Sequence, residues 1–275
     1  MKYLSPAKIN LFLETLGKYE DGYHDIRSVM CGISLYDEIF IEENSKLDIS
    51  FNGEFGHQVE NNNIENLFNF LKKENLINTE AYSIRIKKNI PVGAGLGGGS
   101  SNIATVLNHL ESKKLFDSQK KISISRKLGS DIEFFLENKP AYIVGRGVVQ
   151  KTMEFQLGQF LLIIFPNKPL STKAVYEINT TMNNDFVMND LKTHNFLNLI
   201  KERNNCLEEA AMTLCPDIKI ILDAINSYPE CILGKMSGSG SSCFAVFNNK
   251  NEAIKVQDDL KNKHPDWWTC FAKTI

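Results

Sequence analysis

The sequence lacks the patterns that mark several common protein classes. Its six cysteines form no C-x-x-C pair and its five histidines show no H-x-x-x-H spacing, so neither a zinc site nor a disulfide framework is indicated. No apolar run approaches the roughly twenty residues of a membrane-spanning helix. The opening residues also lack the long apolar segment and small-residue cleavage site of a signal peptide. We therefore expect a cytoplasmic protein with free, mostly buried thiols.

A strong charge of either sign is absent as well. The chain has 31 Lys and Arg against 33 Asp and Glu, a formal net charge of -2, so no global field favours nucleic acid or an anionic membrane as partner. The apolar and charged fractions, 43% and 23%, are ordinary for a globular protein. Any anionic ligand would have to be attracted by local groups.

Period-two alternation and short apolar runs predict strands, whereas apolar residues at helical spacing predict helices. The predicted strands are 5–14, a segment starting at Ile33, 47–51, 82–87, 141–145 and 160–165. The predicted helices are 64–73, 102–110, 118–128 ended by Gly129, and several after residue 172, the last starting near Asn251. Residues 17–22 are predicted to form a turn-rich loop. A boundary within residues 153–158 divides the chain into two α+β domains, 1–155 and 156–275.

The segment Pro91–Ser101 is the most informative part of the sequence. It has five glycines in the seven positions from Gly93 to Gly99, between a predicted strand and a predicted helix. Glycines let the backbone approach a ligand closely, and the N–H groups of the loop and of the following helix terminus attract phosphate. A plain tight turn is the alternative, but so many glycines are entropically unfavourable unless the exposed backbone is needed.

A dinucleotide site is a second functional interpretation, because Gly93, Gly95 and Gly98 satisfy G-x-G-x-x-G. That motif requires an acidic residue at the end of the next strand, about twenty positions on. Here Glu111 and Asp117 lie in a polar helix-loop stretch instead. The G-x-x-x-x-G-K-[ST] pattern of a Walker loop is absent. The dinucleotide interpretation is therefore the weaker one, and a loop that binds the phosphates of another ligand is the better interpretation.

Other candidate motifs are weaker when each is considered alone. Lys8 interrupts the apolar strand of S-P-A-K-I-N and could simply face outward. Asp131, after the helix end at Gly129, could be a helix cap. The glycine-serine segment within 236–247 could be an ordinary turn, and His24 in G-Y-H a surface residue.

Together these segments resemble the GHMP kinase superfamily. P-A-K-I-N near the start, P-x-G-x-G-L-G-G-G-S-S in the middle and S-G-S-G-S-S-x-F-A-V-F near the end match its three motifs in order. The resemblance covers nearly the whole chain. It implies a two-domain GHMP kinase fold of α+β class, with an N-terminal domain like ribosomal protein S5 domain 2 and a ferredoxin-like C-terminal domain.

Within the superfamily, the chain resembles one branch in two segments. These are D-G-Y-H at 21–24 and the L-G-G-G-S-S-N form of the loop. Its members phosphorylate the 2-hydroxyl of a cytidine-diphosphate-linked methylerythritol in the non-mevalonate isoprenoid pathway. The resemblance therefore implies an ATP-dependent kinase that uses Mg²⁺. Mevalonate and homoserine kinases share the loop but are not expected to carry D-G-Y-H.

The resemblance also implies roles for individual residues. Asp131 would act as base on the substrate hydroxyl, and Lys8 would favour its ionised form and steady the developing negative charge. The predicted ATP-binding residues are Pro91, Val92, Gly93, Ala94, Gly95, Leu96, Gly97, Gly98, Gly99, Ser100 and Ser101, with Lys88 and Asn66 near the nucleoside. The predicted substrate-binding residues are Asn10, Tyr23, His24, Tyr176, Gly238 and Gly240. Ser101 is also the candidate magnesium ligand.

Three alternatives stay open at this point: another small-molecule kinase of the superfamily, a non-catalytic ATP- and metabolite-binding regulator on the same fold, and a nicotinamide-dependent oxidoreductase. The sequence also departs from the branch pattern. Cys206 replaces the aspartate of the N-D-L-E segment that is common in the branch. Ser130 and Glu133 replace alanine and proline beside Asp131, and Met30 takes the place of an aromatic residue.

Overall fold

The computed structural model describes residues 1–77, 82–154, 160–183 and 200–275. The chain forms two compact units, and neither is a continuous stretch of sequence. The first unit consists of Met1–Ala7, Leu35–Val92 and Gly97–Asn138, and the second of Lys8–Ser34, Gly93–Leu96 and Lys139–Ile275. The predicted domain boundary at 155/156 lies outside the described residues and stays a prediction.

Two long strands contribute residues to both units. β1 (Lys2–Lys18) pairs with β2 (His24–Glu43) in a six-stranded sheet. In the first unit the end of β2 pairs with β4 (Tyr82–Lys87), with Glu38 opposite Lys87. In the second unit the start of β2 pairs with β5 (Ala141–Gly145), with Ile26 opposite Gly145.

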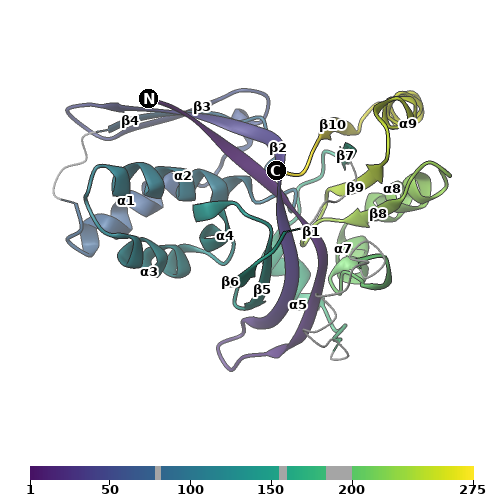
Figure 1. The fold of residues 1–275 in the computed structure, drawn as a ribbon, viewed down its shortest axis with the longest axis horizontal. Coiled ribbons are helices and arrows are strands. Elements are labelled where there is room, and N and C mark those ends of the chain that lie inside the picture. Colours follow the sequence, from purple (N-terminus) through teal and green to yellow (C-terminus); the bar gives the residue numbers. More distant parts are fainter. Residues whose placement is uncertain (78–81, 155–159, 184–199) are drawn as a thin grey trace. The chain divides into compact units, whose positions relative to one another are not determined.

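The first unit combines part of this sheet with a group of helices. β3 (Asp48–Asn52) runs parallel to β4, and Figure 1 shows the helices gathered on one side of these strands. The helices are η1 (Gly56–Gln58), α1 (Asn63–Lys73), α2 (Gly98–Ser112), α3 (Ser118–Leu128) and α4 (Ile132–Glu137). α1 buries residues at helical spacing, namely Ile64, Leu67, Phe68 and Leu71, and its cap Asn62 accepts a hydrogen bond from Glu65 N at 3.0 Å.

The second unit contains a four-stranded antiparallel sheet in the order β10-β7-β9-β8. Its strands are β7 (Phe160–Phe165), β8 (Leu233–Met236), β9 (Cys243–Phe247) and β10 (Trp268–Ala272). With α5 (Thr172–Ile178), α7 (Glu208–Leu214) and α8 (Asp217–Asn226) before β8, and α9 (Lys250–Lys263) before β10, this order is ferredoxin-like. β6 (Val148–Thr152) forms a hairpin with β5.

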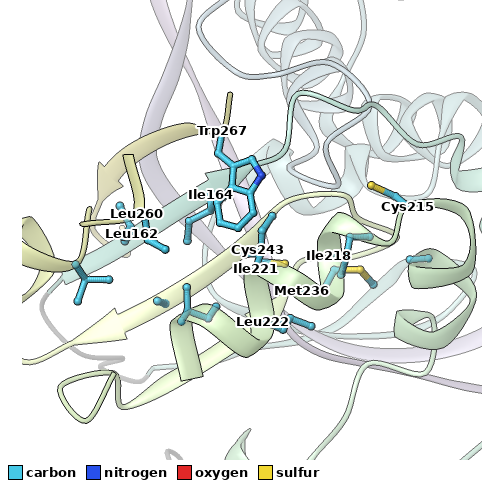
Figure 2. Packing of buried hydrophobic residues seen from close by; sticks show 14 of the residues in the cluster. Leu162, Ile164, Cys215, Ile218, Ile221, Leu222, Met236, Cys243, Leu260 and Trp267 are labelled. Carbon is cyan, nitrogen blue, oxygen red and sulfur yellow. The ribbon is translucent and has the colours of Figure 1, made fainter. Parts of the chain in front are cut away.

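The core of the second unit lies between this sheet and its helices. Figure 2 shows Leu162 and Ile164 of β7 packed with Cys243 of β9, with Ile221 of α8 and with Leu260 of α9. Residues 160–165 were predicted to be a strand, and β7 lies between two neighbours with Leu161–Phe165 fully buried, as the nearly all-apolar sequence F-L-L-I-I-F suits.

Most predicted elements are confirmed, several to the residue. β4, β5, β7 and α3 have the predicted bounds, and α3 ends at Gly129 as expected. The prediction of a loop over 17–22 was partly wrong, because β1 continues through Lys18, and β2 begins at His24 rather than Ile33. α4, β6 and β10 were not predicted.

The six cysteines are free, and four of them are buried, in agreement with the prediction. Burial raises the pKa of the Cys31 thiol to about 12, so this side chain stays protonated. Among the described residues, no helix combines the length and the hydrophobicity that crossing a membrane requires.

Candidate active site

The glycine-rich segment follows β4 and leads into α2, which confirms the predicted order of strand, loop and helix. Gly93, Gly95 and Gly97 have φ of 64°, 75° and 71°, in the left-handed region that favours glycine. Gly97 is the N-cap of α2, and no side chain caps this helix. The N–H groups of its first turn, together with the helix dipole, therefore suit an anion such as a phosphate.

Within the second unit, Gly95 lies directly against the glycine-serine loop between β8 and β9. A Cβ atom at Gly95 would stand 2.2 Å from Ser237 O and 2.9 Å from Gly240 O. Ser242 N donates to Ala94 O at 3.1 Å. The two glycine-rich segments that sequence analysis singled out are thus packed backbone against backbone, at a distance that only glycine allows.

Lys8 lies on β1 next to both of these segments. Its side chain is buried, and its Nζ donates to Asn10 Oδ1 at 2.5 Å and to Gly95 O at 3.0 Å. A Cβ atom at Gly238, where φ is 58°, would lie 3.1 Å from Nζ. The alternative of an outward-facing strand lysine is therefore wrong. The structure brings Lys8, Asn10, Gly95 and Gly238 together within one unit.

Asn10 connects this group to two serines that sequence analysis missed. Its Nδ2 donates to Ser28 Oγ at 2.8 Å and its backbone N to Ser237 Oγ at 3.3 Å. Ser237 Oγ in turn donates to Gly95 O at 3.1 Å. The signal for Ser237 was its place in the second glycine-serine motif, but nothing in the sequence around Ser28 indicates this contact.

Asp131 belongs to the first unit, where it stands half-buried at the N-cap of α4. It therefore occupies the position that the helix-cap alternative predicted, although its side chain makes no capping hydrogen bond. Lys8 belongs to the second unit, and its approach to Asp131 stays a prediction.

A buried polar network supports the glycine-rich segment in the first unit. Asp37 Oδ1 accepts hydrogen bonds from the backbone N of Asn89 at 2.8 Å and of Ile90 at 2.9 Å. Its Oδ2 accepts from Lys88 Nζ and from Asn102 Nδ2. Because residues 89 and 90 directly precede Pro91, this carboxylate fixes the entry into the segment. Asp37 was not among the predicted site residues, although a carboxylate within an apolar strand is a signal that could have identified it.

Three predicted ATP-binding residues lie in the first unit, and two of them have side-chain contacts there. Lys88 is buried against Asp37 and Asn102, so its contact with the nucleoside stays a prediction. Ser101 is fully buried, and its hydroxyl accepts a hydrogen bond from Ser5 Oγ at 2.7 Å. Asn66 is exposed on α1.

Two of the predicted substrate-binding residues are in contact. The rings of His24 and Tyr176 lie 4.9 Å apart and are tilted by 35°. Burial, and secondly the charge of Lys18, lower the pKa of His24, which favours neutral imidazole at pH 7. Tyr23 is 58% exposed, and the Arg146 guanidinium lies 5.3 Å from its ring.

Comparisons with known proteins identify the family. The GHMP kinases N terminal domain matches residues 62–136, and the GHMP kinases C terminal domain matches residues 188–266. A 4-diphosphocytidyl-2-C-methyl-D-erythritol kinase of Anaplasma phagocytophilum (strain HZ) is 33% identical, with 98% of this chain and 93% of the relative covered. The chain belongs to the 4-diphosphocytidyl-2-C-methyl-D-erythritol kinase family of GHMP kinases. The kinase of that name from Pelagibacter ubique (strain HTCC1062) is 34% identical over 100% of this chain and 99% of the relative.

Solved structures give the same result. A 4-(cytidine 5'-diphospho)-2C-methyl-D-erythritol kinase is 27% identical, with a TM-score of 0.78 and 99% of both chains covered. Mevalonate kinase of L. major in complex with R-mevalonate is 15% identical with a TM-score of 0.67, over 100% of this chain and 96% of that one, and shows the fold alone. The predicted family and two-domain fold are confirmed, and GHMP kinases use ATP as phosphate donor.

Proposed function

We propose that the protein transfers the γ-phosphoryl group of ATP to the 2-hydroxyl of 4-diphosphocytidyl-2-C-methyl-D-erythritol. The hydroxyl oxygen would form a bond to the γ-phosphorus, and the bond from that phosphorus to the β–γ bridging oxygen would break. The products are ADP and the 2-phosphate of the cytidyl diphospho sugar. The hydroxyl proton would pass to the carboxylate of Asp131.

One observation carries this proposal at the level of geometry. The buried ammonium of Lys8 donates to the carbonyl of Gly95, inside the segment whose glycines and helix terminus suit phosphate. A fixed cation beside a phosphate loop stabilises the negative charge that develops during phosphoryl transfer. The similarity to named kinases over the full chain supports the choice of acceptor.

Mg²⁺ is part of the proposal, and the described residues offer it few ligands. Among the described residues no group of three or more His, Cys, Asp or Glu could hold a metal ion. This fits Mg²⁺ that arrives with ATP, because Mg²⁺ keeps several waters and is held largely by substrate phosphates. When bound it would neutralise charge on the phosphates. That Ser101 is a protein ligand of Mg²⁺ stays a prediction. Its hydroxyl oxygen accepts a hydrogen bond from Ser5 in this structure.

On the acceptor side, we propose that the contacting pair His24 and Tyr176, with Tyr23 and Asn10, binds the cytidine diphosphate portion. A neutral histidine can both donate and accept hydrogen bonds, which suits the edge of a cytosine. Gly238 and Gly240 would form the floor beneath the reacting groups.

The test is release of ADP by purified protein with MgATP, offered in turn the cytidyl diphospho methylerythritol, mevalonate and homoserine. Turnover with the first acceptor alone is expected, and phosphorus NMR of the product should show a new monoester at the 2-position. Turnover only with another acceptor would keep the kinase and discard this substrate. ATP binding with no turnover of any acceptor would support the regulator instead.

A further inference from the structure

Asn205 is a buried side chain to which sequence analysis assigned no role. Its Nδ2 donates to the carbonyl oxygens of Gly238 at 2.7 Å and Met236 at 3.3 Å, and its Oδ1 accepts from Leu207 N at 3.1 Å. One amide therefore holds the last carbonyl of β8 and a carbonyl of the glycine-serine loop that follows it. Neither an aliphatic side chain nor a carboxylate could make both donations.

The segment that carries Asn205 is itself fixed to β1. Leu13 of β1 forms a parallel bridge with Asn205, and Cys206 N donates to Leu13 O at 2.7 Å. The buried ammonium of Lys235 donates to the carbonyls of Ile200 and Arg203, just before this segment. Asn205 is thus held from both sides, and its position is fixed relative to β1, the strand that also carries Lys8.

The loop held by Asn205 is the one that contacts Lys8. A Cβ atom at Gly238 would lie 3.1 Å from Lys8 Nζ and 3.0 Å from Asn10 Oδ1. The adjoining Ser237 donates to Gly95 O, which also accepts the bond from Lys8. A displacement of Gly238 would therefore reach the Lys8 ammonium and the Gly95 carbonyl without any change to either residue.

We propose that Asn205 is a positioning residue for phosphoryl transfer: its amide holds the carbonyls of Met236 and Gly238 so that the glycine-serine loop fixes the Lys8 ammonium. This inference rests on the proposed function. Asn205 acts through the loop and through Lys8, and it touches no reacting atom. A misplacement of about 1 Å near a reacting centre lowers the rate by about 10²-fold, which sets the expected size of the effect.

The experiment compares Asn205→Ala and Asn205→Asp with a matched control, Asn226→Ala. Asn226 Nδ2 also donates to two backbone carbonyls of the same unit, Leu222 O at 2.9 Å and Gly234 O at 3.4 Å, but neither belongs to the glycine-serine loop. Wild-type turnover with MgATP and the cytidyl acceptor is measured first, so that failure of the proposed function is recognised separately. We then measure kcat, KM for ATP and the thermal midpoint.

We expect Asn205→Ala to lower kcat by about 10²-fold while KM for ATP changes little, and Asn226→Ala to leave kcat near wild type. Asn205→Asp adds a measurement, the pH dependence of kcat, that would not change if Asn205 had only a structural role. An ionised carboxylate cannot donate to Gly238 O, whereas the protonated form donates one hydrogen bond. Burial of this position raises the pKa of the new carboxyl above its ordinary value of about 4, so its kcat relative to wild type should rise as the pH falls from 8 to 5.

Two results would overturn the inference. One is an Asn205→Ala variant whose kcat stays within about threefold of wild type. The other is an Asn205→Asp variant whose kcat, relative to wild type, does not change with pH. If Asn205→Ala does not fold, the pH dependence of Asn205→Asp decides alone. If wild type turns over no acceptor, the proposed function fails before Asn205 is tested.

Discussion

At the scale of single residues, Asp131 carries the strongest expectation. Replacing it with Asn keeps the shape and removes the base, so kcat should fall by roughly 10²–10⁴-fold while KM for ATP is nearly unchanged. Steady-state kinetics with the cytidyl acceptor measure both values. Glu133→Gln on the same helix is the control, because the Glu133 carboxylate already pairs with Arg126 at 2.6 Å, and this change should leave kcat unaltered. If Asp131→Asn keeps most of its kcat, Asp131 is not the general base.

Gly95 allows a prediction about stability. An Ala at φ 75° with its Cβ 2.2 Å from Ser237 O is strained and also clashes with backbone, so Gly95→Ala should destabilise by at least about 2 kcal/mol. Gly17→Ala is the matched control, since no atom lies within 4 Å of its Cβ position, and its stability should stay within about 0.5 kcal/mol. Urea unfolding of both variants measures the difference. Equal midpoints would show that the loop can yield at Gly95.

Some residues of the candidate site could be predicted from the sequence, and others could not. Lys8, Gly95 and Gly238 were identified because their motifs are contiguous and their chemistry is local. Asp37 and Asn205 were missed as site residues, because their importance comes from partners far along the chain: Asp37 holds residues 89 and 90, and Asn205 holds Gly238. Short spacing patterns carry no information on such contacts.

At the scale of elements, the turn between β1 and β2 offers a test of how the acceptor is recognised. Arg146 pairs with Asp21 at 2.7 Å, and its guanidinium lies 4.6 Å from the Tyr19 ring. Arg146→Met should therefore loosen the segment that leads into His24 and raise KM for the cytidyl acceptor about threefold to tenfold, with kcat and KM for ATP little changed.

A double-mutant cycle checks that prediction. Asp21→Asn should raise the same KM, and the double variant should show less than the product of the two single effects, because both remove one ion pair. Lys219→Met, which breaks an exposed pair with Asp223 on α8, is the control. Fully multiplicative effects would show that Arg146 and Asp21 act separately.

The elements that sequence failed to predict share one physical cause. β10 and β6 are short and carry no strict alternation, and they become strands only by pairing with β7 and β5. β2 begins earlier than predicted because Ile26–Met30 pairs with residues 141–145, more than a hundred positions later. By contrast, α3 could be placed correctly because its cap Asp117 and its terminator Gly129 are local signals.

At the scale of the whole molecule, Lys235 makes stability depend on pH. Burial lowers its pKa from 10.5 to about 8, partly opposed by Glu208 and Glu14. Between these values the unfolded chain binds the proton more tightly than the folded one, so stability rises with pH across that window. The shift corresponds to about 3 kcal/mol. The penalty is fully present below pH 8 and absent above pH 10.5.

The measurement is the free energy of unfolding of wild type and Lys235→Met at pH 7, 8, 9 and 10. Other lysines titrate in both proteins, so only the difference between the two curves reports on Lys235. That difference should shift in favour of wild type as the pH rises. Parallel curves would show that the ammonium is better solvated than its burial indicates.

The sharing of β1 and β2 between both units has a consequence for how such a protein can evolve. The second unit needs Lys8–Ser34 from the start of the chain, and its last residues pair back onto β2, where Ile275 N donates to Gly32 O at 3.0 Å. Recombination that joined residues 1–155 of one relative to 156–275 of another would take residues 8–34 from one parent and the C-terminal residues that pair with them from the other. The two halves should therefore be inherited as one block, and chimaeras joined at that point should fold poorly, because their β1 and β2 come from a different parent than residues 156–275.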